Sequence, residues 1–164
     1  MKYFAYGSNM CLQRLRERVR SAKKVTTACL KGHLLKFHKI SIDGSGKCDI
    51  HETGYDSDLV YGVVYEVDEC EKSGLDRAES LGYGYELKTV EVMADARRIK
   101  AFTYYATAID ESLKPYKWYK AYVVCGAKEN GFPHAYIAML EGSPDLEDPD
   151  KSRRELNTLS TPPI

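Results

Sequence analysis

The sequence has no excess of charge of either sign, because 24 lysines and arginines balance 24 aspartates and glutamates. A neutral chain has no overall field to hold it to a nucleic acid or a membrane surface, so neither is expected as a partner. Long apolar runs are also missing, and none approaches the length that crosses a bilayer. The first residues show no signal-peptide pattern, and we expect a cytoplasmic protein.

Signatures of several kinds of site are missing as well. There is no Walker A pattern, no GxSxG and no GxGxxG. The five cysteines are scattered and form no CxxC pair, which is typical of reduced thiols rather than of a disulfide framework. Cys48 with His51, and His33 with His38, are metal-ligand types without a completing pair at zinc-finger spacing. We therefore expect no bound metal.

What the sequence does contain is a series of strand patterns with few helices between them. We expect strands at 2–6, 25–30, 34–42, 47–52, 59–67, 85–93 and 99–107, and helices at 9–18, 68–81, 115–130 and 133–141. The Asp-Gly-Ser-Gly break at 43–46 predicts a hairpin, and Asp68 is the expected N-cap of its helix. This order is not a βαβ series. It predicts an α+β fold, a small, mixed and mostly antiparallel β-barrel with helices packed outside.

The first ten residues combine a strand, a tight turn and a helix start. The strand and turn comprise Tyr3, Phe4, Ala5, Tyr6, Gly7, Ser8 and Asn9. Backbone N–H groups in such a turn are not all used by secondary structure, so they can hold an anion or a carbonyl oxygen. A strand followed by an ordinary N-cap is the plainer interpretation.

Glu79 lies late in the helix predicted at 68–81, just before a Gly-Tyr-Gly-Tyr turn. Asp76 lies three residues before it, on a neighbouring position of the same face. A solvated surface acid is the simple interpretation. Placed against apolar and aromatic groups instead, a carboxyl group can both accept and donate a proton near pH 7.

A further block, Gly126-Ala127-Lys128-Glu129-Asn130-Gly131-Phe132-Pro133, marks a helix end and a restart at proline. These segments together resemble the γ-glutamylcyclotransferase family. The resemblance rests on residues 3–10, 60–65 and 75–79, on Tyr85, and on Tyr119 with the 126–133 block. It covers residues 1 to about 140. We expect a domain at 1–142 and a C-terminal tail at 143–164 that is partly helical or loose.

The resemblance implies a reaction and a site. Enzymes of this family convert γ-glutamyl-amino acids to 5-oxoproline and the free amino acid, with no metal or cofactor. Glu79 matches the catalytic glutamate, and the strand and turn from Tyr3 to Asn9 match the substrate-binding segment. Tyr85 and Tyr119 match pocket tyrosines, whereas Ser80 stands where many relatives have glycine. A small-molecule γ-glutamyl substrate and, by analogy, a homodimer are therefore expected.

Other interpretations of the function stay open at this point. The motif residues do not indicate the identity of the leaving amine, so the substrate could be a specialised γ-glutamyl amine or a biosynthetic intermediate. A binding module that holds a γ-glutamyl ligand without turnover is a second class, although ligand holding alone does not require Glu79 as a proton carrier. A purely structural domain is a third, and it would show no ligand-dependent melting shift.

Overall fold

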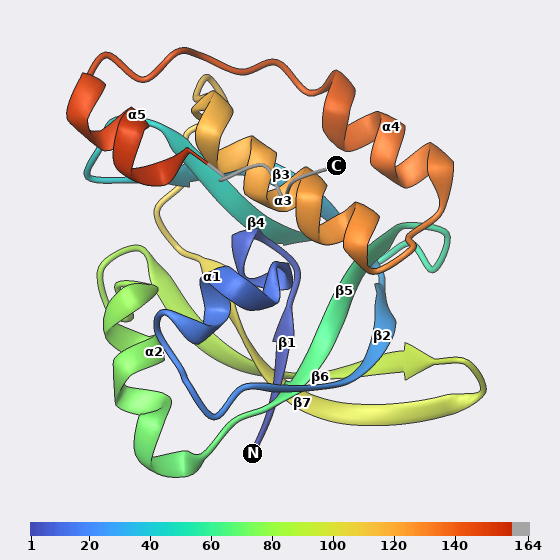
Figure 1. Cartoon of the computed structure of the whole chain (residues 1–164). Coiled ribbons are helices and arrows are strands. Elements are labelled where there is room, and N and C mark those ends of the chain that lie inside the picture. Colours follow the sequence, from blue (N-terminus) through green and yellow to red (C-terminus); the bar gives the residue numbers. More distant parts are fainter. Residues whose placement is uncertain (159–164) are drawn as a thin grey trace.

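Five strands close into a barrel in the computed structural model, which describes residues 1–158 (Figure 1). They are β1 (Lys2–Ala5), β2 (Lys23–Lys31), β5 (Leu59–Glu66), β6 (Tyr85–Ala94) and β7 (Arg97–Ala106). Their order is β1-β5-β2-β6-β7, and every neighbouring pair is antiparallel except β1 and β7, which meet in parallel at Tyr3 and Phe102. The predicted fold, a mixed and mostly antiparallel barrel, is confirmed.

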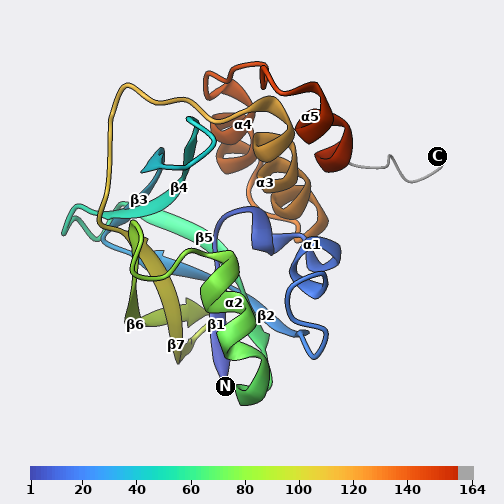
Figure 2. The ribbon, with the colours of Figure 1, turned by 90° about the vertical axis from the view of Figure 1, so that its left-hand side faces the viewer.

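The predicted hairpin at 43–46 also forms, but its strands stand outside the barrel. β3 (His33–Ile40) and β4 (Gly46–Glu52) make a separate two-stranded antiparallel sheet, which Figure 2 shows to one side of the barrel. Backbone hydrogen bonds tie this hairpin to the segment after β7, from the Ile40 amide to the Ala108 carbonyl and from the Gly46 amide to the Lys114 carbonyl, both at 2.9 Å. The hairpin is therefore attached through a loop rather than through the barrel's own ladder.

The helices follow the expected order with shorter bounds. They are the 3-10 turns η1 (Ser8–Met10) and η2 (Glu69–Glu71), and the α-helices α1 (Leu12–Arg16), α2 (Lys72–Ala78), α3 (Lys117–Glu129), α4 (His134–Gly142) and α5 (Lys151–Asn157). Asp68 stands at the expected N-cap position, but the prediction that it caps the helix is wrong, because its side chain forms no capping hydrogen bond. The Glu71 amide, which that side chain would bind, instead donates to the Asp68 carbonyl at 3.1 Å within a 3-10 turn.

Two sides of the molecule hold the turn that follows β1. The Tyr65 hydroxyl on β5 donates to the Met10 carbonyl at 2.7 Å. From the other side, Gly126 lets α3 approach closely, because a Cβ there would lie 2.7 Å from the Met10 Cβ and 2.9 Å from the Cys11 nitrogen. The fully buried Val63, Val64 and Phe4 belong to the hydrophobic core around the barrel strands that carry the turn. The turn is thus fixed between the barrel and α3.

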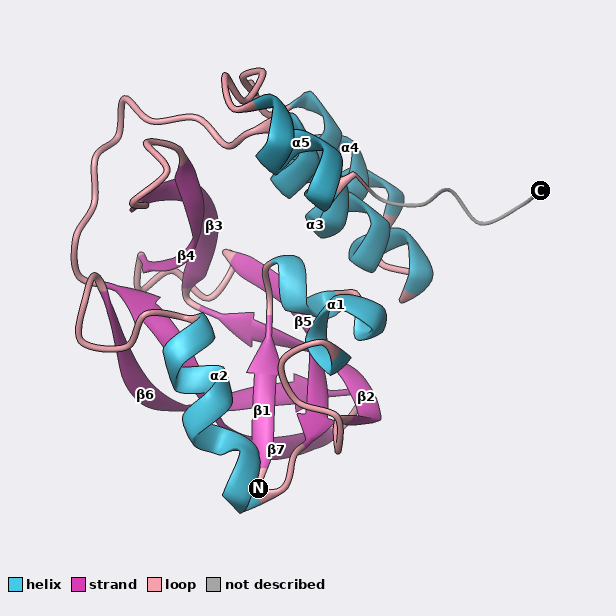
Figure 3. Ribbon diagram, turned by 60° about the vertical axis from the view of Figure 1, so that its left-hand side comes forward, coloured by secondary structure: helices cyan, strands magenta, loops and turns pink. Residues whose placement is uncertain are grey.

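Helices α3, α4 and α5 group together beyond one end of the barrel (Figure 3). Asp148, which is buried, anchors α5 by accepting two hydrogen bonds of 2.6 Å from Arg153 and one of 2.8 Å from the Trp118 indole on α3. The expected tail at 143–164 therefore contains one helix, and its residues 159–164 lie outside the described part of the chain. No helix among residues 1–158 is both long and apolar enough to cross a membrane.

Candidate active site

A pocket of about 280 Å³ lies where the turn after β1, the end of α2 and the β3–β4 hairpin meet. Its lining comprises Tyr3, Tyr6, Gly7, Ser8, Asn9, Cys48, Glu79, Tyr85, Tyr104 and Tyr119. These residues come from the start, the middle and the last third of the chain. Flat aromatic rings with hydroxyl tips therefore dominate a cavity closed at one side by a carboxylate.

Most of the residues predicted for the site line this pocket. The structure brings together Tyr3, Tyr6, Gly7, Ser8, Asn9, Glu79, Tyr85 and Tyr119. Phe4 and Ala5, which were predicted with them, are fully buried in the barrel core and do not line the pocket. The Phe4 carbonyl instead accepts a hydrogen bond of 2.8 Å from the Thr103 hydroxyl, so this part of β1 supports the turn from below.

Glu79 is not a solvated surface acid, because its side chain is only 17% exposed. It ends α2 as the C-cap, and Ser80 then takes a positive φ of 55° that turns the chain sharply. One carboxylate oxygen, Oε1, accepts hydrogen bonds from the Asn9 amide at 2.7 Å and from the Arg18 guanidinium at 2.8 Å. Within residues 1–158 no hydrogen bond ends on Oε2, so that oxygen is available to a bound molecule.

Asn9 links the turn to this carboxylate. Its side-chain nitrogen also contacts the Tyr3 hydroxyl at 3.1 Å, and its oxygen accepts from Arg18 at 2.8 Å. Arg18 thus holds Asn9 and Glu79 together with one nitrogen, and sequence reasoning missed it. It is one of four arginines at alternate positions 14–20, and nothing in that spacing distinguishes it from the others. Its ion pair with Glu79 fixes the position of the carboxylate at the end of α2.

The tyrosines of the pocket are neutral hydroxyl groups at ordinary pH. Burial, which removes water from the charged form, raises the pKa of Tyr3, Tyr6, Tyr85 and Tyr119 well above its usual value. The Tyr85 hydroxyl donates to the Cys48 carbonyl, and the Tyr119 hydroxyl accepts from the Cys48 amide at 3.1 Å. These tyrosines therefore line the pocket in fixed positions, where their hydroxyl groups form hydrogen bonds and do not act as bases.

Two other groups near the site are poor candidates for its chemistry. Burial raises the pKa of the Cys48 thiol to about 12, which keeps it protonated and weakly nucleophilic. Asp76, which the helical spacing places beside Glu79, turns elsewhere: it accepts from Lys72 at 2.7 and 2.8 Å and from the Tyr104 hydroxyl at 2.6 Å. Glu79, by contrast, lines the pocket with its carboxyl group.

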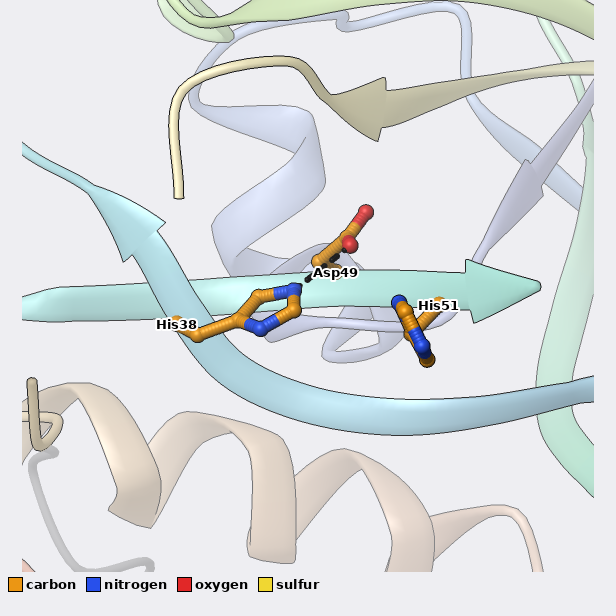
Figure 4. Close-up of side chains that lie close together, drawn as sticks. All are labelled: His38, Asp49 and His51. Atoms are coloured by element: carbon orange, nitrogen blue, oxygen red, sulfur yellow. Dashed lines mark hydrogen bonds and ion pairs between the residues drawn. The ribbon is translucent and has the colours of Figure 1, made fainter. Parts of the chain in front are cut away.

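The possible metal ligands fall into a different part of the hairpin (Figure 4). His38, Asp49 and His51 offer ligand atoms within 4.8 Å of one another. However, His38 is already held at both nitrogens, by Asp49 at 2.8 Å and by Glu111 at 3.0 Å. The second Asp49 oxygen accepts from the Ala106 amide at 2.7 Å. A cation would have to break these hydrogen bonds, so the group fits a structural network that fastens the hairpin to β7.

Comparison with known proteins places this site in a family. A model of the AIG2-like family matches residues 59–140. The γ-glutamylcyclotransferase of Bos taurus is 33% identical over 145 residues, which cover 84% of this chain and 76% of that protein. The chain belongs to the γ-glutamylcyclotransferase family. This confirms the resemblance deduced from the motifs and the expectation of an enzyme of this type.

Two further members of the γ-glutamylcyclotransferase family extend the match beyond the motif-bearing segments. The γ-glutamylcyclotransferase of Mus musculus is 30% identical over 164 residues, covering 96% of this chain and 86% of that protein. A solved structure named γ-glutamyl cyclotransferase superimposes with a TM-score of 0.85 at 26% identity, covering 96% of this chain and 97% of the other. The family fold therefore includes the helices that follow the barrel.

Proposed function

We propose that this protein closes the γ-glutamyl group of a γ-glutamyl-amino acid or γ-glutamyl amine into 5-oxoproline and releases the free amine, with Glu79 as the general acid and base. One observation carries the proposal. Glu79 closes the side of an aromatic pocket with Oε1 held by Asn9 and Arg18 and with Oε2 available to a substrate. A carboxylate held by one oxygen can exchange a proton through the other without losing its position.

The reaction needs few groups from the protein because the substrate supplies both reacting atoms. The α-amine attacks the γ-carbonyl carbon, the C–N bond to the leaving amine breaks, and a five-membered lactam remains. Folding the substrate into that geometry can supply an effective molarity of about 10⁵ M or more. Two protons leave the α-nitrogen and two arrive at the leaving nitrogen. Glu79 can carry each of them in turn, since both nitrogens are on the same substrate beside Oε2.

The turn after β1 can stabilise the charge that develops on the carbonyl oxygen. The amides of Ser8 and Asn9 begin the 3-10 turn η1, where N–H groups have no partner within the helix. Within the described residues no hydrogen bond uses them. Preorganised donors of this kind are worth about 10²- to 10³-fold in rate each. The position of these amides beside Glu79 supports a role in holding the γ-carbonyl oxygen.

The test is 5-oxoproline release by Glu79→Gln. This change keeps the shape and removes the exchangeable charge, so we expect kcat to fall by about 10²- to 10⁴-fold. Asp76→Asn is the matched control, because Asp76 lies one turn earlier on the same helix and outside the pocket lining. Circular dichroism and the melting temperature would establish that both variants fold. Near-normal turnover by folded Glu79→Gln would remove Glu79 from the mechanism.

A further inference from the structure

A second pocket, of about 420 Å³, adjoins the first and shares Ser8, Glu79, Tyr85 and Tyr119 with it. Four basic side chains line this second pocket: Arg14, Arg18, Lys39 and Lys47. We call it the cationic pocket. Because Glu79 belongs to both linings, the cationic pocket lies beside the proton-carrying carboxylate rather than at a remote surface. None of its lysines was a candidate on sequence grounds, since isolated lysines in strands ordinarily face solvent.

Lys39 is buried, and no carboxylate of the described residues lies within ion-pair distance of it. Its relative exposure is 5%, and among the described residues its ammonium takes part in no ion pair or hydrogen bond. The ammonium lies over the face of the Tyr85 ring, 4.6 Å from its centre. Lys39 also pairs directly with Lys47 across the β3–β4 ladder, and like charges opposite each other destabilise a sheet. Burial lowers the pKa of the Lys39 ammonium, and the carboxylates of Glu79 and Asp43 offset this only in part.

The other basic groups are only partly neutralised. Lys47 binds Asp43 at 2.6 Å and lies 4.7 Å above the Tyr119 ring. Arg14 has a relative exposure of 9%, stacks over the Tyr122 ring at 4.4 Å, and its buried Nε has no hydrogen-bond partner among the described residues. A buried donor without a partner costs free energy unless a ligand accepts from it. Arg14 is thus a second basic side chain of the pocket lining that has no ion-pair partner among the described residues.

The charge balance of the cationic pocket indicates what kind of ligand it would bind. Of its four positive side chains, two form an ion pair within 4 Å: Arg18 with Glu79, and Lys47 with Asp43. Among residues 1–158, Lys39 and Arg14 are therefore left without an ion pair. Buried charges persist where a ligand completes them, because an isolated buried ion is costly. A molecule with two anionic groups at this position would satisfy Lys39 and Arg14 together.

We propose that the cationic pocket binds the carboxylates of the leaving amino acid, so that γ-glutamyl dipeptides with an acidic leaving residue are preferred. This inference rests on the proposed function. Glu79 must reach the leaving nitrogen in order to protonate it, so the leaving half of the substrate lies beside Glu79, where the cationic pocket opens. The α-carboxylate and the side-chain carboxylate of a leaving glutamate or aspartate match the two uncompensated cations.

Three substrates whose leaving halves carry two, one and no carboxylates test this inference: γ-glutamylglutamate, γ-glutamylalanine and γ-glutamylalaninamide. Hydrogen bonds to charged groups are worth about tenfold or more in affinity each, so we expect kcat/KM to fall by about tenfold or more at each step of the series. Equal kcat/KM for the three substrates would overturn the inference while leaving the proposed function intact. Release of 5-oxoproline from none of them would overturn both.

A variant pair assigns the preference to the cationic pocket. Lys39→Met keeps the length of the side chain and removes its charge, and we expect the kcat/KM ratio of γ-glutamylglutamate to γ-glutamylalaninamide to fall by about tenfold or more. Lys36→Met is the matched control on the same strand, because Lys36 is half-buried, pairs with Glu111 at 3.0 Å and lies outside the cationic pocket. An unchanged ratio in folded Lys39→Met would refute the role of the pocket.

Discussion

Replacing Gly126 by alanine tests how the candidate site is held in place. The added Cβ would lie 2.7 Å from the Met10 Cβ, 2.9 Å from the Cys11 nitrogen and 3.0 Å from the Met10 carbonyl carbon. Two of these are backbone atoms and the third is the stiff base of a side chain, so none can rotate away. Either α3 or the turn after β1 must therefore move by about 0.5–1 Å to restore ordinary contact distances.

The expected size of the effect follows from that geometry. Overpacking a close-packed contact of this kind costs about 1–3 kcal/mol of unfolding free energy. In a protein of this size such a loss lowers the melting temperature by about 2–12 °C. The turn also carries Asn9, which holds Glu79 by a hydrogen bond of 2.7 Å. A displacement of about 1 Å at a reacting centre can cost about 10²-fold, so kcat should fall by up to that factor.

Thermal unfolding followed by circular dichroism and 5-oxoproline release measure the two effects. Gly142→Ala is the control, because Gly142 ends α4 and a Cβ there would meet nothing within 4 Å. We expect this control to leave both quantities close to those of the unmodified protein. If Gly126→Ala melted and turned over like Gly142→Ala, the reasoning that α3 fixes the position of the turn would be refuted.

Three further changes test other parts of the structure. Ser80 holds a positive φ of 55°, so Ser80→Gly should relieve strain of about 1 kcal/mol and raise the melting temperature by about 2–4 °C; a lower melting temperature would contradict this. The Arg153 hydrogen bonds hold the pKa of Asp148 well below its usual value, so its stabilising effect is present above about pH 4 and is lost as the pH falls through the folded-state pKa. The melting temperature of Asp148→Asn should therefore fall less than that of the unmodified protein as the pH is lowered below about 4. Thermal melts at a series of acidic pH values would measure this difference. Cys70 is exposed whereas Cys48 is buried with a pKa of about 12, so mass spectrometry should find that iodoacetamide labels Cys70 first; faster labelling of Cys48 would mean that the pocket opens.

Local patterns were sufficient to predict much of the barrel. The run of β-branched and aromatic residues at 59–67 corresponds to β5, and the Asp-Gly-Ser-Gly break lies between β3 and β4. Gly131, expected to end α3, has a positive φ of 65° just beyond it. Each of these features depends on residues close together in the chain, where turn chemistry and side-chain periodicity act directly.

Features that depend on distant residues could not be predicted in the same way. The barrel closes through one parallel pairing of Tyr3 with Phe102, and neither segment indicates its partner. Arg18 and Glu79 meet across 61 residues. Lys39 stands in a strand with an ordinary polar pattern and becomes buried only because the hairpin folds against Tyr85. The motif resemblance predicted most of the residues that line the aromatic pocket, whereas the four basic side chains of the cationic pocket required coordinates.

The hairpin's position outside the closed barrel has a consequence for how such proteins can diversify. Lys39, Ser41 and Lys47 belong to an outlying ribbon, whereas Glu79 and the amides of the first turn are carried by the barrel and the helix beside it. Substitutions of Lys39, Ser41 and Lys47 therefore leave in place the turn after β1 and helix α2, which carry the rest of the candidate site. Under the proposed function, exchange of these three ribbon residues between relatives offers a route to an altered choice of departing amine beside an unchanged Glu79.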